Sequence, residues 1–93
     1  MIKTTKGKIA KRIWQRNPSK KLLNDYEIMW ESLSLLDAIT DLEQLDKIPG
    51  LRLHNLIGGC EGQRSFWIGK TKYRVCFVWK DGNAYEVEIV DYH

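Results

Sequence analysis

Cysteine, histidine and proline each occur only twice in this chain of 93 residues. No uninterrupted apolar run approaches the roughly 20 residues that a membrane-spanning helix needs. The two cysteines, Cys60 and Cys76, are too few for a disulfide scaffold, and their spacing matches no metal-binding motif. We therefore expect two reduced thiols that pack as small hydrophobic side chains. Basic residues interrupt the N-terminal segment, so a secretory signal is not expected, and the prediction is a cytoplasmic protein without metal or cofactor.

The composition is that of an ordinary globular protein. Hydrophobic residues make up 43% of the chain and charged residues 29%, which excludes the disordered and fibrous classes. A chain of this length has room for one hydrophobic core. The sequence therefore predicts a single domain over residues 1–93.

The net charge of +3 conceals a strong segregation along the chain. Residues 1–21 carry eight basic side chains and no acidic one, whereas residues 22–50 carry seven acidic side chains and one basic one. A dense basic segment attracts polyanions such as nucleic acid. A solvated surface or a match to an acidic protein partner explains the same pattern, so the charge alone leaves these alternatives open.

Apolar residues at helical spacing predict a short helix over about residues 8–16 and a longer one over about 20–39, separated by Pro18. The apolar stripe of the longer helix consists of Leu22, Tyr26, Met29, Leu33 and Leu36, widened by Leu23, Trp30 and Ile39. Thr40–Glu43 has the pattern of a capping box, in which the Thr40 hydroxyl accepts a hydrogen bond from the Glu43 amide. We expect a short third helix there, ended by Pro49-Gly50.

The C-terminal half has the composition of β-strands, and residues 2–5 are a candidate for a short first strand. The four candidate strands are Leu51–Leu56, Ser65–Ile68, Tyr73–Trp79 and Ala84–Val90. The fold class that follows is α+β: a small, mainly antiparallel sheet with two to three helices on one face.

The turn at Lys80-Asp81-Gly82 sets the register of the last two strands. A two-residue loop would place Phe77 opposite Glu86, whereas a three-residue loop pairs Phe77 with Tyr85 and Val75 with Val87. We expect the three-residue loop, because it keeps apolar residues together, and it also places Arg74 opposite Glu88. The sheet face away from the helices would then carry Arg74, Cys76, Glu86 and Glu88 and would be open to a ligand.

The two histidines are the candidates for acid–base chemistry. His54 alternates with Leu51 and Leu53, so it should project away from the core with Arg52. His93 ends the chain, after Asp91 and Tyr92. Two such groups can cleave a phosphodiester without a metal, one removing a proton from the nucleophile and one protonating the leaving oxygen, while nearby cations stabilise the developing charge. The alternative is that they are two unrelated surface histidines.

Four tryptophans suggest stacking with nucleobases. Trp14, Trp30 and Trp79 fall on predicted core faces and are better explained by packing. The pattern does not assign an orientation to Trp67.

Several stretches together resemble the HigB toxins of the RelE/ParE superfamily, also called plasmid maintenance system killer proteins. The similar stretches are Met1–Lys3, Leu35–Ala38 with Asp41-Leu42, Pro49–His54, Tyr73–Phe77, Lys80–Tyr85 and the ending Asp91-Tyr92-His93. The resemblance implies a compact α+β toxin of a type II toxin–antitoxin system, acting as a ribosome-dependent mRNA endonuclease (an mRNA interferase) without a metal. Its partners would be the ribosome, mRNA and a helix-turn-helix antitoxin, with DNA contacted only through that antitoxin.

The resemblance also implies roles for individual residues. His54, Asp91, Tyr92 and His93 match catalytic positions, and Arg74 matches the basic residue that faces the phosphate. Further contacts to RNA are expected from Arg52, Arg64, Lys70 and Lys72.

Two features depart from the family pattern. Ile57 stands where many members carry a lysine, and the usually basic segment that follows contains Glu61. Arg64, or Lys70 and Lys72, would have to substitute for the missing charge. Two alternatives therefore stay open: a catalytically weakened toxin fold that mainly binds its antitoxin, and a ParE-like gyrase poison.

Overall fold

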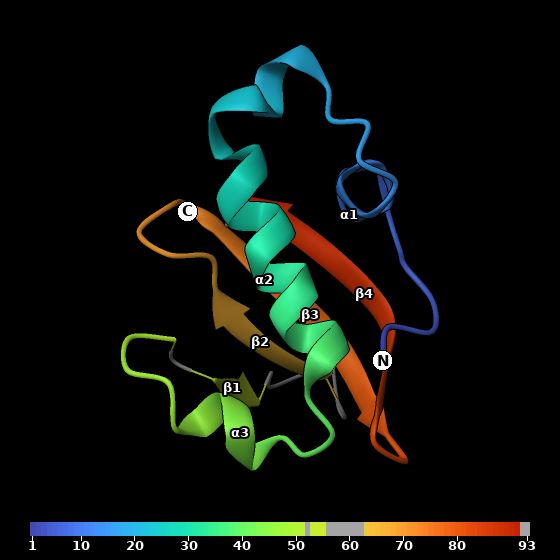
Figure 1. The fold of residues 1–93 in the computed structure, drawn as a ribbon, viewed down its shortest axis with the longest axis vertical. Helices are drawn as coiled ribbons and strands as arrows, with labels where there is room; N and C mark the ends of the chain where they lie inside the picture. Colours follow the sequence, from blue (N-terminus) through green and yellow to red (C-terminus); the bar gives the residue numbers. More distant parts are fainter. Residues whose placement is uncertain (52, 56–62, 92–93) are drawn as a thin grey trace.

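The computed structural model describes residues 1–51, 53–55 and 63–91, and it confirms the α+β class (Figure 1). Four strands form one sheet in the order β1-β2-β3-β4, and each neighbouring pair is antiparallel. The helices are α1 (Lys8–Trp14), the 3₁₀ helix η1 (Lys20–Asp25), α2 (Tyr26–Ala38) and α3 (Glu43–Asp46). The strands are β1 (His54–Asn55), β2 (Gln63–Trp67), β3 (Tyr73–Lys80) and β4 (Asn83–Asp91).

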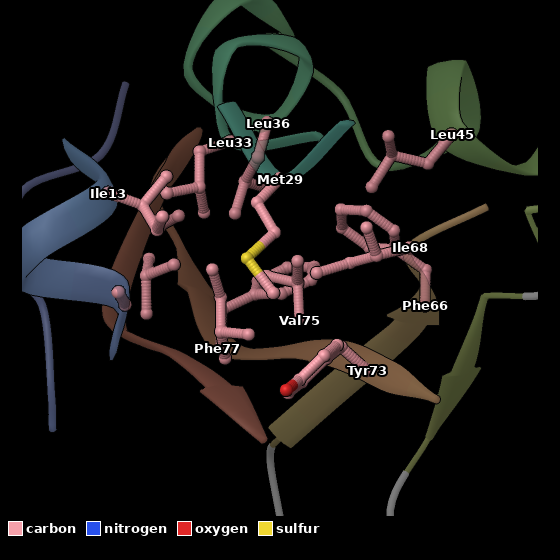
Figure 2. Packing of buried hydrophobic residues seen from close by; sticks show 14 of the residues in the cluster. Ile13, Met29, Leu33, Leu36, Leu45, Phe66, Ile68, Tyr73, Val75 and Phe77 are labelled. Carbon is pink, nitrogen blue, oxygen red and sulfur yellow. The ribbon is translucent and has the colours of Figure 1, made fainter. Parts of the chain in front are cut away.

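The hydrophobic core lies between the helices and one face of the sheet. Figure 2 shows Met29, Leu33 and Leu36 of α2 directed toward sheet residues that include Val75 and Phe77. Ile13 of α1 and Leu45 of α3 extend the same core on either side and are fully buried. Burying one such side chain stabilises the fold by roughly 1.5–3 kcal/mol. The other buried apolar residues are Ala10, Leu22, Ile39, Phe66, Ile68, Tyr73, Ala84, Val87 and Ile89.

The long helix predicted over 20–39 is two elements, because its first part is the 3₁₀ helix η1. A 3₁₀ helix has three residues per turn, so it does not continue the apolar stripe of an α-helix. Leu22 is buried as predicted, whereas Leu23 is 58% exposed and was wrongly included in the stripe. None of the helices in the described ranges has both the length and the apolar character that crossing a membrane requires.

The helix predicted over 8–16 ends at Trp14, two residues early. Arg16 has a left-handed backbone with φ of 59°, which cannot continue an α-helix. Its guanidinium lies over the Trp30 ring, 4.2 Å from the ring centre, and the Trp14 and Trp30 ring centres are 5.0 Å apart. These contacts fasten the end of α1 to α2.

The predicted capping box before α3 is present but displaced by one residue. The Asp41 carboxylate, and not the Thr40 hydroxyl, accepts from the Glu43 amide at 2.9 Å. The Gln44 side chain, and not that of Glu43, accepts from the Thr40 and Asp41 amides at 2.8 and 3.0 Å. Gln44 lies three residues after Asp41, so the reciprocal contacts form around Asp41, one residue before Leu42, the N-cap of α3.

The candidate strand at residues 2–5 runs along the outer edge of β4. Ile2 and Thr5 form parallel bridges to Ala84 and Val87, and the Thr4 hydroxyl accepts from the Glu86 amide at 2.8 Å. The bridges are isolated and no continuous ladder forms. The segment nonetheless pairs with an edge that would otherwise expose backbone donors and acceptors.

The hairpin between β3 and β4 has a two-residue loop, so the three-residue loop predicted from the sequence is wrong. Lys80 pairs with Asn83, and the loop residues Asp81 and Gly82 have φ of 53° and 78°. Positive φ at both positions is the requirement of a type I′ turn, for which Asp-Gly is a preferred sequence.

A β-bulge explains how the two-residue loop keeps apolar residues together. Val78 pairs with Tyr85 and Cys76 with Glu88, so β4 contains one more residue than β3 between these pairs. Glu86, with φ of 50°, lies in this irregular stretch. The extra residue shifts the alternation of β4, so Val75 meets Ile89, while Arg74 meets Val90 instead of the predicted Glu88.

Candidate functional site

The sheet face opposite the helices carries two adjacent rows of paired residues near one end of the sheet. One row consists of Trp67, Arg74 and Val90, and the next of Ser65, Cys76 and Glu88, with the backbone of His54 paired to Ser65. Directly paired residues of an antiparallel sheet share a face, and positions two apart along a strand share it as well. The register therefore brings Arg74 of β3 and the His54 position of β1 into neighbouring rows.

Arg74 is held by an aromatic partner on the neighbouring strand. Its guanidinium carbon lies 4.4 Å from the centre of the Trp67 ring, and both residues are partly buried. Such a cation–π contact is worth about 0.5–2 kcal/mol, more when water is excluded. The Trp67 amide donates to the Leu51 carbonyl at 3.1 Å, which ties this end of β2 to the segment before β1. A planar guanidinium fixed in this way is suited to binding phosphate oxygens.

The middle of this face is closed, contrary to the prediction that Cys76 lies on an open surface. Cys76 is 7% exposed and its neighbour Ser65 is fully buried. Both side chains are short, and longer residues flank them on the same face, which shields them from water. The Ser65 hydroxyl makes no hydrogen bond within the described residues. Arg74 and Glu88 keep partial exposure, so access is from the ends of the face.

Lys72 and Asp91 form an ion pair at the edge of the site, with Nζ 3.3 Å from Oδ2. The hydrogen bond and the negative charge of Asp91 raise the pKa of Lys72 above its usual value. Asp91 pairs with Tyr73, the residue that precedes Arg74 in β3. The register thus places Asp91 on the sheet face opposite Arg74, and its carboxylate contacts Lys72.

The other two described residues that were predicted to contact RNA, Lys70 and Arg64, differ in position. Lys70 is exposed and lines a hollow beside Trp67. Arg64 pairs with Phe77, so its position is on the opposite sheet face from Trp67. Ser65 and Phe66 separate the two residues along β2. Lys70 is therefore grouped with Trp67 and Arg74, and Arg64 is not.

The strand register sets the separation between His54 and Arg74. His54 pairs with Ser65, and Ser65 with Cys76, so two inter-strand spacings, roughly 10 Å in total, separate the His54 backbone from β3. Arg74 lies two residues from Cys76, which adds about 7 Å along the strand. The two offsets are perpendicular, so the backbones of His54 and Arg74 lie roughly 12 Å apart.

Three of the predicted site residues, Arg52, Tyr92 and His93, lie outside the described residues, as do Cys60 and the departures at Ile57 and Glu61. The orientation of Trp67 was left unassigned from the sequence. A signal was available, because its neighbours Phe66 and Ile68 are both apolar, and the structure shows both fully buried. Strict alternation around two core residues places Trp67 on the opposite face.

Comparisons with known proteins add no family assignment. The chain matches no family model and no curated protein sequence.

Proposed function

We propose that this chain is the toxin of a type II toxin–antitoxin system and cleaves mRNA in the decoding site of the ribosome. The observation that carries the proposal is the Arg74 guanidinium, held against Trp67 in the row next to that of His54. The α+β architecture is the one that the resemblance to HigB toxins implies. The proposed setting is the cytoplasm, with a helix-turn-helix antitoxin as the neutralising partner.

The proposed chemistry needs only side chains. A general base removes the proton from a ribose 2′-OH, and the oxygen attacks the adjacent phosphorus. The bond to the 5′-oxygen of the next nucleotide breaks, and a general acid protonates that oxygen. The products are a 2′,3′-cyclic phosphate and a 5′-hydroxyl. His54 and His93 are the proposed acid–base pair, with Tyr92 assisting, and Arg74 stabilises the charge that develops on the phosphate oxygens. Asp91 would act through its ion pair with Lys72.

The test is a toeprint assay on ribosomes translating a defined message, with the purified chain added. The expected result is a new 3′ end within the decoding-site codon, abolished in the His93→Ala and His54→Ala variants. Growth arrest on induction of the wild-type chain, relieved by His93→Ala, is the expected result in cells. Intact message at saturating protein, together with normal growth at high expression, would refute the proposal.

The structure offers a matched control for the arginine. Arg16 lies over Trp30 at 4.2 Å, much as Arg74 lies over Trp67 at 4.4 Å. Arg74→Gln should reduce cleavage about 100-fold, as the loss of one charge-stabilising donor does. Arg16→Gln removes the same kind of contact elsewhere and should leave cleavage unchanged. Equal losses in both variants would assign the effect to folding.

A second candidate is a toxin fold that binds its antitoxin and no longer cleaves RNA. Ile57 and Glu61, which stand where basic residues are usual, favour it. It predicts tight binding of the antitoxin with no new 3′ end in the toeprint assay. DNA damage signalling with intact mRNA would instead point to a gyrase poison.

A further inference from the structure

The surface beside Trp67 contains two adjoining hollows of about 360 and 280 Å³. They share four lining residues, Gly50, Trp67, Gly69 and Lys70. Thr71 completes one of them, and Pro49 and Leu51 complete the other. Together they form a groove between the end of β2 and the segment before β1. Ligand sites commonly measure about 300–1,000 Å³, so the size suits a small planar group.

The chemistry of the groove is aromatic and cationic. Trp67 supplies the aromatic wall, Lys70 a positive charge, and none of the described residues that line the two hollows is acidic. Gly50 presents no side chain, and a Cβ added there would meet no described atom within 4 Å. An aromatic wall with a lysine at its rim fits a nucleobase stacked on the ring and a phosphate bound by the ammonium.

A second aromatic hollow serves as a comparison within the same molecule. It has a volume of about 260 Å³ and is lined by Arg16, Tyr26, Glu27, Trp30 and Glu31. Its two glutamates would repel the phosphate of a nucleotide. The described residues of the groove at Trp67 contribute no such repulsion, and the groove lies next to Arg74, the proposed phosphate-binding residue.

We propose that one base of the RNA, next to the cleaved linkage, stacks on Trp67 in this groove while Lys70 binds its phosphate. This inference rests on the proposed function and adds a subsite to it. Arg74 would then contact the scissile phosphate, and Trp67 would both hold Arg74 and position the neighbouring nucleotide. The subsite would contribute to affinity for any base, because stacking is tolerant of sequence.

The experiment measures binding of a 2′-O-methyl RNA trinucleotide, which cannot be cleaved by 2′-OH attack, and of the same probe with one abasic position. Stacking of one base is worth a roughly 5- to 150-fold change in affinity. Trp67→Leu should weaken binding of the intact probe by that factor, and Trp67→Phe by much less. Both variants should weaken binding of the probe that is abasic at the stacked position much less than they weaken binding of the intact probe, because only the hold on Arg74 is then affected.

Two controls keep the result interpretable. Trp30→Leu removes the other arginine-stacked tryptophan and should leave binding unchanged. Lys70→Gln should reduce the slope of log affinity against log salt by about 0.7, the value for one lost phosphate contact on a single strand. A wild-type chain that binds the intact and all abasic probes equally, or binds neither, would overturn the subsite.

The same variants separate this inference from the proposed function. Trp67→Leu with wild-type binding and wild-type cleavage in the toeprint assay would remove the subsite and leave the nuclease standing. Base-dependent binding through Trp67 with no cleavage by the wild-type chain would leave the subsite and remove the nuclease.

Discussion

The Lys72 ammonium lies 3.3 Å from the Asp91 carboxylate and so joins the turn before β3 to the last residue of β4. The hydrogen bond that Lys72 donates to Asp91 is the largest cause of the raised pKa of Lys72, followed by the negative charge of Asp91. Asp91→Asn should therefore lower the pKa of Lys72, measured by NMR titration of the lysine side chain. Asp25→Asn is the control, because Asp25 contributes least, and its effect should be much smaller.

The sign of the stability effect follows from the same shift. A lysine whose pKa is raised on folding stabilises the fold below its unfolded pKa and loses that contribution as pH rises through its folded pKa. Wild type should therefore be more stable than Asp91→Asn at neutral pH, and the difference should vanish in the alkaline range above the folded pKa of Lys72. A difference that persists there would assign the role of Asp91 to something other than this ion pair.

The bulge in β4 predicts an unusual response to glycine. Glu86 has φ of 50°, a conformation that costs a non-glycine residue roughly 1–2 kcal/mol. Glu86→Gly should relieve this strain and leave the free energy of unfolding equal or higher by up to about 1 kcal/mol, measured by urea denaturation. Glu88→Gly, in the regular part of the same strand, should lower stability by about 0.5–1 kcal/mol. The reverse order would contradict the bulge at Glu86.

Replacing the glycine at turn position Gly82 should lower the stability of the protein. Its φ is 78°, so Gly82→Ala should destabilise the protein by about 1 kcal/mol or more, whereas Asp81→Gly should be close to neutral. The measurement is again the free energy of unfolding in urea. A three-residue loop, the one expected from the sequence, would not require positive φ at Asp81, so a clear loss in Asp81→Gly would count against the two-residue turn.

Two leucines test whether residues 20–39 form two elements, η1 and α2, instead of one helix with a single apolar stripe. Leu33 is fully buried and Leu23 is 58% exposed. Leu33→Ala should cost about 2–5 kcal/mol, and Leu23→Ala less than about 0.5 kcal/mol. Similar losses at both positions would mean that residues 20–39 form one continuous helix with a single stripe.

The elements of this fold follow from local sequence, whereas the register of the last hairpin does not. The spacing of Met29, Leu33 and Leu36 predicted α2 and its buried face, because a helix places such residues together without reference to the rest of the chain. The register of β3 and β4 depends on the φ of Glu86, whose amide donates to Thr4 at the far end of the sequence. A rule based on alternation alone cannot include a contact made across 82 residues.

In the candidate site, too, some features follow from local sequence and others depend on how the strands are aligned. Alternation placed Arg74 on the face away from the helices, and the register supports that position. It could not foresee that Trp67 holds the guanidinium, because that contact depends on how β2 is aligned with β3. The buried thiol of Cys76 agrees with its expected packing as a small hydrophobic side chain, whereas the expectation that its sheet face is open was wrong, since that depends on the lengths of its neighbours across the sheet.

The planar contact between Arg74 and Trp67 predicts a graded effect of conservative substitution. Arg74→Lys keeps the positive charge and loses both the flat stacking surface and the fork of donors. Cleavage in the toeprint assay should fall about tenfold in Arg74→Lys, between wild type and the roughly 100-fold loss expected for Arg74→Gln. Arg16→Lys, at the matching contact with Trp30, should cleave as wild type does. Full activity in Arg74→Lys would show that charge alone suffices, and the stacking on Trp67 would then have no part in positioning the phosphate.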